Sequence, residues 1–139
     1  MKILVAVDGS THTEHAIDYL VRHAALFGGA EIELLTVHLP IPGRPARHLG
    51  REVVDSYYGD ECEKALAPAR RALKKAGVQF TEGFKVGNPG EVIAAHADEG
   101  KFDMVIMGSH GHGALGNLVM GSVATEVLAG CKAPVLVIR

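Results

Sequence analysis

The chain has 139 residues, 47% of them hydrophobic, and its 14 Lys and Arg residues nearly balance its 16 Asp and Glu residues. This length predicts one domain that buries about 68–70% of its unfolded surface, with no room for a second core. The formal net charge of −2 provides no basic stripe for a nucleic-acid backbone. We therefore expect a small ligand and no nucleic-acid partner.

Membrane and secretory signals are missing from the sequence pattern. No window reaches the roughly 18 consecutive apolar residues of a membrane span. The apolar run near Met1 is short and stops at Asp8, which indicates a strand and not a signal peptide. Cys62 and Cys131 lack CxxC spacing, which disfavours a disulfide scaffold or a thiolate metal site. We expect a cytoplasmic protein with no membrane partner.

In chain order, short apolar runs alternate with longer helical patterns, which is typical of βαβ units. Near-continuous aliphatic runs predict central strands, and they are Lys2–Val7, Glu31–Val37, Met104–Met107 and Val135–Ile138. The run Val78–Val86 alternates and predicts an edge strand. The helices expected between them are Thr13–Phe27, about Arg51–Ala76, Pro89–Glu99 and Ser122–Ala129. The predicted class is α/β, a single-domain open parallel five-stranded sheet with helices on both faces.

Local signals set the helix starts. Thr11-x-x-Glu14 matches a capping box, and the segment that begins at Asn88 matches another with proline at the first helical position. Pro68 predicts a break or kink in the second helical region. The segment Leu39–Gly50 is rich in proline and glycine and long for a connection, and we interpret it as a mobile flap.

The segment from Gly108 to Ser122 carries the strongest functional signal. It joins an apolar strand to a helix with the pattern Gly, two residues, Gly111, nine residues, Gly121-Ser122. Glycines let backbone N–H groups approach anionic oxygens, and the start of the following helix adds partial positive charge. The segment therefore predicts a phosphate cradle.

Two further residues lie at predicted strand ends, where open parallel sheets bind ligands. Asp8 follows the first strand, and His38 follows the second. Asp8 suits hydrogen bonds to ribose hydroxyls or to a metal-bound water. Because Asp8-Gly-Ser also resembles a turn before a capped helix, a purely structural aspartate is the alternative.

Histidines in the glycine loop allow two interpretations. His110 and His112 lie two residues apart and could ligate a metal, but the sequence provides no third ligand beside them. We therefore favour histidines that are solvated or adjacent to phosphate, and we predict no metal site built from protein ligands.

Taken together, these residues resemble the universal stress protein family. The resemblance rests on Val7-Asp8-Gly9-Ser10, Val86-Gly87-Asn88-Pro89, the glycine pattern from Gly108 to Ser122, and the ending Ala133 to Ile138, and it covers the whole chain. The glycine spacing is similar to that of the ATP-binding branch. The resemblance implies a five-stranded parallel sheet of order 3-2-1-4-5, four flanking helices and a dimer.

The resemblance also implies which residues meet the nucleotide. Asp8 and its neighbouring backbone would face ribose or adenine, and the Val37 main chain would face the adenine edge. Gly108 and Gly111 would line the ribose and α-phosphate. Gly121, Ser122 and Val123 would hold the β- and γ-phosphates. Ala6 stands where some members carry proline, which affects packing alone. The predicted cofactor-binding residues are Ala6, Val7, Asp8, Ser10, Val37, Met107, Gly108, His110, Gly111, Gly121, Ser122 and Val123.

Catalytic signals are weak. The loop Gly108–Ser122 contains no lysine or arginine, unlike a Walker-type P-loop, so N–H groups, hydroxyls, the helix dipole and Mg²⁺ would neutralise the phosphates of ATP. No Ser-His-Asp or GxSxG arrangement appears. We therefore predict a regulatory module without catalytic residues, which binds an adenine nucleotide and changes its contacts with an unidentified protein partner.

Two other classes stay open at this point. The first is an enzyme, either a slow ATPase or a protein that phosphorylates itself at Ser109 or Ser122. The second is a dinucleotide or flavin redox domain, which fits the fold class but lacks a GxGxxG turn after the first strand.

The last strand bears on assembly. Val135–Ile138 has no predicted helix after it, and an uncovered strand edge is a template for pairing with another chain. We expect a homodimer in which the two last strands pair across a two-fold axis.

Overall fold

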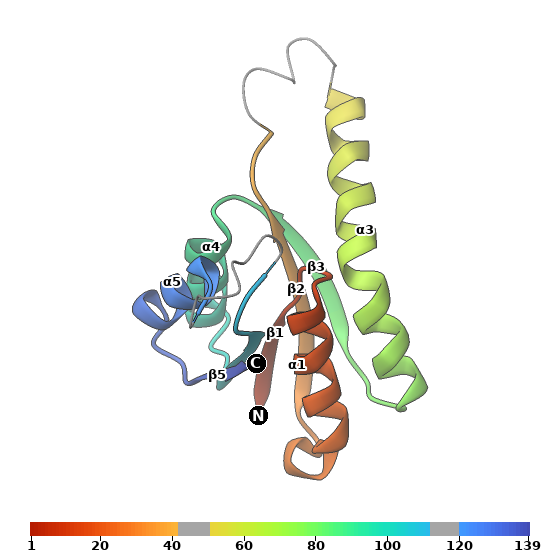
Figure 1. Cartoon of the computed structure of the whole chain (residues 1–139), viewed down its shortest axis with the longest axis vertical. Coiled ribbons are helices and arrows are strands. Elements are labelled where there is room, and N and C mark those ends of the chain that lie inside the picture. Colours follow the sequence, from red (N-terminus) through yellow and green to blue (C-terminus); the bar gives the residue numbers. More distant parts are fainter. Residues whose placement is uncertain (42–50, 112–119) are drawn as a thin grey trace.

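The computed structural model describes residues 1–41, 51–111 and 120–139, with residues 51–56 described through their backbone alone. Figure 1 shows a twisted sheet between two helical layers. The strands are β1 (Lys2–Ala6), β2 (Glu31–His38), β3 (Thr81–Val86), β4 (Met104–Gly108) and β5 (Val135–Ile138). They form one five-stranded parallel sheet of order β3-β2-β1-β4-β5, which confirms the expected fold.

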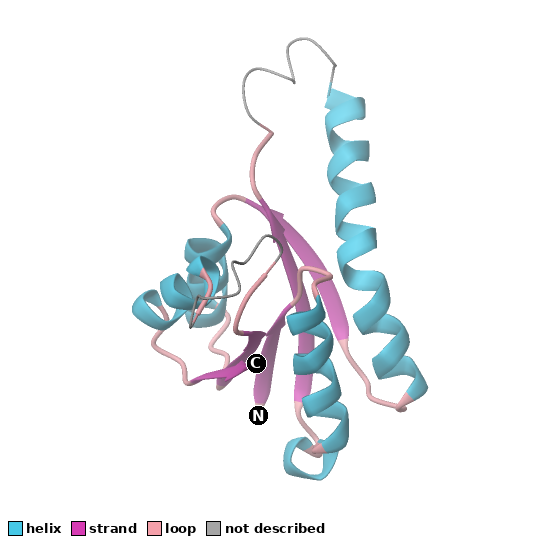
Figure 2. Ribbon diagram, in the orientation of Figure 1, coloured by secondary structure: helices cyan, strands magenta, loops and turns pink. Residues whose placement is uncertain are grey.

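Helices cover both faces of this sheet, as Figure 2 shows. They are α1 (Thr11–Arg22), the short 3-10 helix η1 (Ala24–Phe27), α3 (Arg51–Lys75), α4 (Pro89–Glu99) and α5 (Ser122–Gly130). α1 and α3 lie on one face, over a core that includes Ile3 and Leu34. α4 and α5 lie on the other, over a core that includes Leu4 and Val105. No helix in the described part of the chain is long and apolar enough to cross a membrane.

The two edge strands of the sheet are β3 and β5. β3 lies at an edge, as its alternation predicted, and Phe84 is half exposed there. The aliphatic run of β5 wrongly predicted a central strand, because β5 forms the opposite edge. Its composition reflects partial cover on both faces, since Leu136 packs against the α1 side and Val137 against the α5 side.

Two helix boundaries differ from the predicted ones. α1 begins at Thr11 and not at Thr13, because Ser10 is its N-cap and accepts a hydrogen bond from the Thr13 N–H at 3.3 Å. The Thr11-x-x-Glu14 capping box is therefore wrong. α1 also ends at Arg22, and η1 follows as a separate turn, so that the single helix expected up to Phe27 is wrong as well.

The helix α3 continues through Pro68, and the expected break is wrong. Pro68 removes one backbone donor, but Leu66 and Ala69 on either side of it are buried in the same core, which holds the helix together. α3 ends in a Schellman motif, in which the Val78 N–H donates to the Leu73 carbonyl at 3.0 Å and the Gly77 N–H to the Lys74 carbonyl at 3.1 Å. Because Val78 belongs to this cap, β3 begins at Thr81, three residues after the predicted start at Val78.

Side chains tie α3 to the sheet. Arg70 donates to Glu63 on its own helix and to Glu82 on β3, with N–O distances of 2.6 and 2.8 Å. The hydrogen bond from Arg70 lowers the pKa of Glu63. At the other end, the Ile41 N–H donates to the Tyr58 hydroxyl at 2.8 Å. This bond attaches the chain after β2 to α3, whereas residues 42–50 of the predicted flap lie outside the described residues.

Candidate functional site

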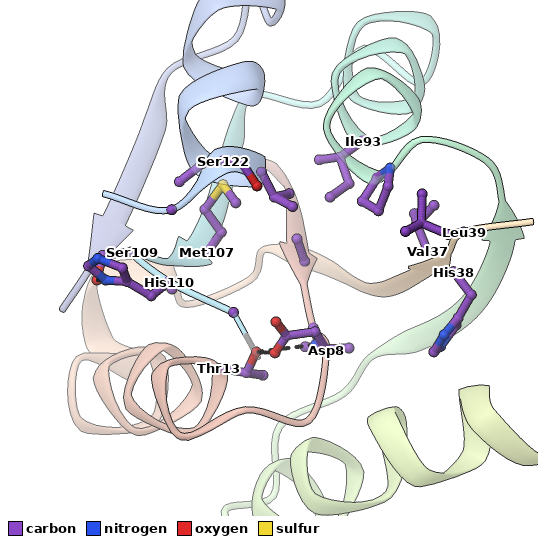
Figure 3. A pocket seen from close by; sticks show the side chains of 18 residues that line it. Asp8, Thr13, Val37, His38, Leu39, Ile93, Met107, Ser109, His110 and Ser122 are labelled. Carbon is purple, nitrogen blue, oxygen red and sulfur yellow. Dashed lines mark hydrogen bonds between the residues drawn. The ribbon is translucent and has the colours of Figure 1, made fainter. Parts of the chain in front are cut away.

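A pocket of about 470 Å³ opens where β1, β2 and β4 reach their carboxyl-terminal ends (Figure 3). The first turns of α4 and α5 form its other wall. This is the edge at which open α/β sheets bind ligands. The residues that line the pocket are Ala6, Val7, Asp8, Thr13, Val37, His38, Leu39, Pro89, Ile93, Met107, Gly108, Ser109, His110, Gly111, Gly121, Ser122, Val123 and Ala124.

All residues predicted to bind the cofactor line this pocket except Ser10. Ser10 is buried, and its hydroxyl caps α1 while its N–H donates to Asp8 Oδ1 at 2.9 Å. Its role is therefore to shape the turn behind the pocket. A ligand contact at Ser10 stays a prediction, because a serine after a strand suits a ligand contact and a helix cap equally well.

Asp8 combines the two roles that its sequence context left open. Its Oδ1 accepts hydrogen bonds from Ser10 N–H and, at 2.6 Å, from the Thr13 hydroxyl. The same hydroxyl accepts from the Asp8 N–H at 3.2 Å. These bonds fix the carboxylate at the end of β1, where Figure 3 shows it directed into the pocket. A turn aspartate thus also presents a positioned carboxylate to the cavity.

The amino-terminal end of α5 provides hydrogen-bond donors. Its N-cap is Gly121, which has no side chain to satisfy the first N–H groups. The helical hydrogen bonds begin where the Thr125 N–H donates to the Gly121 carbonyl at 3.1 Å. The N–H groups of Ser122, Val123 and Ala124 precede that bond, and these three residues line the pocket. An uncapped helix start that faces a cavity favours an anionic ligand group.

Glycines at the site allow the chain segments to approach one another. A Cβ atom at position 108 would lie 2.7 Å from the His12 carbonyl carbon, so Gly108 lets α1 approach the end of β4. At position 111 it would lie 2.6 Å from Asp8 Oδ2. A Cβ atom at position 121 would lie 3.2 Å from the Ser109 carbonyl oxygen. The same oxygen accepts a hydrogen bond from the Gly121 N–H at 2.7 Å. The glycine spacing therefore joins β1, β4 and α5 around one cavity.

Part of the pocket wall contains apolar side chains. Val37 and Leu39 come from the end of β2, and Pro89 and Ile93 from the first turns of α4. Such a wall suits a planar, weakly polar ring. Sequence reasoning missed Thr13, Leu39, Pro89, Ile93 and Ala124 as lining residues, and it noted His38 and Ser109 without including them among the cofactor-binding residues. Their positions next to predicted strand ends and helix starts were a usable signal for most of them.

Charges at the site are few. Among the described lining residues, Asp8 is the sole carboxylate and there is no lysine or arginine. His110 places its Nδ1 atom 2.9 Å from the Ser109 hydroxyl oxygen. Within the described ranges, no group of three or more His, Cys, Asp or Glu residues is arranged to hold a metal ion. His112, the other histidine considered as a ligand, lies outside the described residues.

The comparisons with known proteins agree with this architecture. The model of the universal stress protein family matches residues 1–139. A universal stress protein from Thermus aquaticus, encoded in a QAH/OAS sulfhydrylase 3' region, is 32% identical over 140 residues, which cover 99% of this chain and 97% of that protein.

Two solved structures extend the likeness to three dimensions. Hypothetical protein MJ0577 of Methanocaldococcus jannaschii superposes with a TM-score of 0.84 at 28% identity, covering 99% of this chain and 94% of that one. A universal stress protein solved in complex with cAMP superposes with a TM-score of 0.66 at 26% identity, covering 100% and 96%. With the family match over its full length, the chain belongs to the universal stress protein family.

Proposed function

We propose that this chain is a regulatory module that binds an adenine nucleotide in the pocket at the ends of β1, β2 and β4. The observation that carries the proposal is the convergence of α5's uncapped first turn, the fixed Asp8 carboxylate and an apolar wall on one cavity. The cavity of about 470 Å³ is within the usual size range for small-molecule sites. The structure of a family member in complex with cAMP supports the same ligand class.

The residues suit the parts of a nucleotide. The base fits against Val37 and Ile93, and the Asp8 carboxylate can accept hydrogen bonds from ribose hydroxyls. The phosphates fit at the N–H groups of Ser122 and Val123. This assignment gives each of these five residues a chemical partner of matching polarity.

Within this class we propose ATP with Mg²⁺ as the physiological ligand. The described lining has a single carboxylate, so Mg²⁺ would be held mainly by the phosphates and would arrive with them. The cation would supply the positive charge that the described lining side chains do not. The bound state, and not turnover, would then carry the signal to a protein partner.

We further propose a homodimer through the C-terminal strand Val135–Ile138. β5 is the edge strand next to β4, and its outer edge is the exposed template for pairing. The described side chains of this strand are partly buried on both faces, so pairing would extend both cores.

A second candidate function is slow phosphoryl transfer to the protein itself. The observation that favours it is the 2.9 Å contact between the Ser109 hydroxyl and His110 Nδ1 inside the pocket, which resembles a hydroxyl beside a general base. Ser109 is 3% exposed, which disfavours attack on a phosphate without movement of the loop. We therefore rank this function below nucleotide binding.

Identification of the ligand that co-purifies with the protein tests the proposed function. Mass spectrometry of the supernatant after mild denaturation should show an adenine nucleotide at close to one molecule per chain. After removal of that ligand, added Mg-ATP should raise the melting temperature, because any ligand selective for the native state stabilises it. A protein without nucleotide that also melts at the same temperature with and without Mg-ATP would refute the proposal.

A further inference from the structure

Two histidine rings from different elements meet beside the pocket. His110 follows β4 and lines the cavity, and His12 lies in the first turn of α1. Their ring centroids are 5.0 Å apart, with planes inclined by 45°. The close approach at Gly108 brings the two elements together. His110 is also next to the start of α5, because a Cβ atom at position 121 would lie 3.2 Å from the His110 Cα.

The groups around the pair are identifiable on each element. From the end of β1 comes Asp8, whose Oδ1 is held by Ser10 and Thr13. From α1 comes His15, whose ring centroid is 6.1 Å from that of His12 and whose Nδ1 lies 3.1 Å from the main-chain oxygen of Arg139, after β5. Beside His110 lies the Ser109 hydroxyl, and α5 adds its partially positive amino-terminal end.

The described pocket lining includes one carboxylate and no lysine or arginine. Histidine is therefore the residue type that can bring a full positive side-chain charge to this lining. Histidine side chains change charge between about pH 5 and 8. The two rings are 5.0 Å apart, so an anion beside one of them also lies close to the other.

We propose that the His12–His110 pair makes phosphate binding proton-linked, so that nucleotide affinity rises as the pH falls from 8 to 6. This inference rests on the proposed function. A phosphate at the start of α5 favours the protonated imidazole, and binding therefore takes up a proton. The sign follows from linkage: because the complex holds more protons than the free protein, affinity is gained at low pH and lost as the pH rises. One linked proton limits the effect to about tenfold per pH unit.

The probe for this test is cAMP, whose phosphodiester carries one constant negative charge across this range. Phosphomonoesters such as AMP lose a proton near pH 6 and would confuse the result. Adenosine serves as the matched ligand without phosphate. Dissociation constants are measured by calorimetry at pH 6, 7 and 8 in buffers of equal ionic strength.

Three variants separate the pair from other histidines. His110→Asn retains a polar group near Ser109 without a titratable ring, and His12→Gln removes the second ring. His23→Gln is the control, because His23 lies at the carboxyl-terminal end of α1, where its Nδ1 bonds to the Tyr19 carbonyl oxygen, and it does not line the pocket. Circular dichroism melts establish that each variant folds. His12→Gln decides the question if His110→Asn does not fold.

The expected result is a cAMP affinity about 3–10-fold higher at pH 6 than at pH 8 in the unchanged protein and in His23→Gln. Adenosine affinity should change less than about twofold, and the cAMP slope should be lost in His110→Asn and reduced in His12→Gln. A cAMP affinity independent of pH, or a slope that both variants retain, would overturn the inference while nucleotide binding stands. Failure of the unchanged protein to bind either ligand at any pH would refute the proposed function itself.

Discussion

Asp8 and Gly111 approach each other closely in the site, because a Cβ atom at position 111 would lie 2.6 Å from Asp8 Oδ2. No side chain fits between this carboxylate and the loop after β4 unless one of them moves. The two residues are more than one hundred positions apart in the sequence, and the parallel pairing of β1 with β4 places them together.

Gly111→Ala should therefore weaken nucleotide binding about tenfold or more, since relief of such a contact costs about 1–3 kcal/mol. Calorimetric titration with Mg-ATP measures the loss. Gly83→Ala is the control, because a Cβ atom on this β3 residue would meet nothing within 4 Å. Equal affinities for Gly111→Ala and Gly83→Ala would show that the loop adapts and that the close approach has no role in binding.

Thr13→Val tests the network behind Asp8. The Thr13 hydroxyl donates to Asp8 Oδ1 at 2.6 Å, and Thr13 is 5% exposed. Hydrogen bonds to charged groups contribute about 1.5–3 kcal/mol to stability. The free energy of unfolding should fall by about that amount in urea denaturation, and nucleotide affinity should fall with it. Thr11→Val, at an exposed position two residues earlier, should stay within about 0.5 kcal/mol. A Thr13→Val protein as stable as Thr11→Val would contradict this role of the network.

Gly121→Val should abolish nucleotide binding while the protein stays folded. A Cβ atom at position 121 points at the Ser109 oxygen and the His110 Cα, both at 3.2 Å, so the larger side chain would separate α5 from the loop that it packs against. Gly121→Ala should show a smaller loss, because it adds one carbon where valine adds three. Fluorescent nucleotide titration compares the two variants, and retained affinity in Gly121→Val would be the contrary result.

Val137→Pro tests the proposed dimer without disturbing the pairing of β5 with β4. The Val105 and Ser109 N–H groups donate to the carbonyls of Pro134 and Ile138, so even-numbered residues of β5 face β4 and the Val137 N–H faces outward. Proline at this position removes an outward donor and keeps the donors that face β4, although it also replaces a side chain that packs on the α5 side. Light scattering should show a dimer for the unchanged protein and a monomer for the variant. A monomeric unchanged protein at all concentrations would exclude this interface.

Turnover of ATP should be slow, below about 1 s⁻¹, because fast phosphoryl transfer needs a permanently charged group at the transferring phosphate and the described lining has no lysine or arginine. Phosphate release measured over hours gives the rate. At saturating ATP, Ser109→Ala and His110→Asn should leave that slow rate unchanged if the protein is a binding module. A loss of ATP-dependent phosphorylation in both variants would support the second candidate function.

Periodicity and turn chemistry predicted the fold well. The parallel sheet and the edge position of β3 follow from runs such as Lys2–Val7 and from the alternation in Val78–Val86. The errors occurred where tertiary contacts decide between local alternatives. Ser10 and Thr11 both suit an N-cap, and burial of Ser10 selects it. Pro68 disfavours a helix locally, but packing of its neighbours outweighs that cost.

Some residues of the site could also be predicted from the sequence, and others could not. Residues of the glycine pattern and strand ends were predicted as ligand contacts because their chemistry is visible in the sequence, and the structure places them around one pocket. Leu39, Pro89 and Ile93 were missed, because an apolar side chain that lines a cavity looks like one that fills a core. Their role depends on how α4 is placed over the sheet, which no local pattern encodes.

The most direct test of the central claim is calorimetric titration of the nucleotide-free protein with ATP in the presence of Mg²⁺. The account predicts saturable binding at one site per chain, competition by cAMP for that same site, and a marked loss of affinity in Gly111→Ala. A titration without heat, together with an unchanged melting temperature at saturating Mg-ATP, would contradict it.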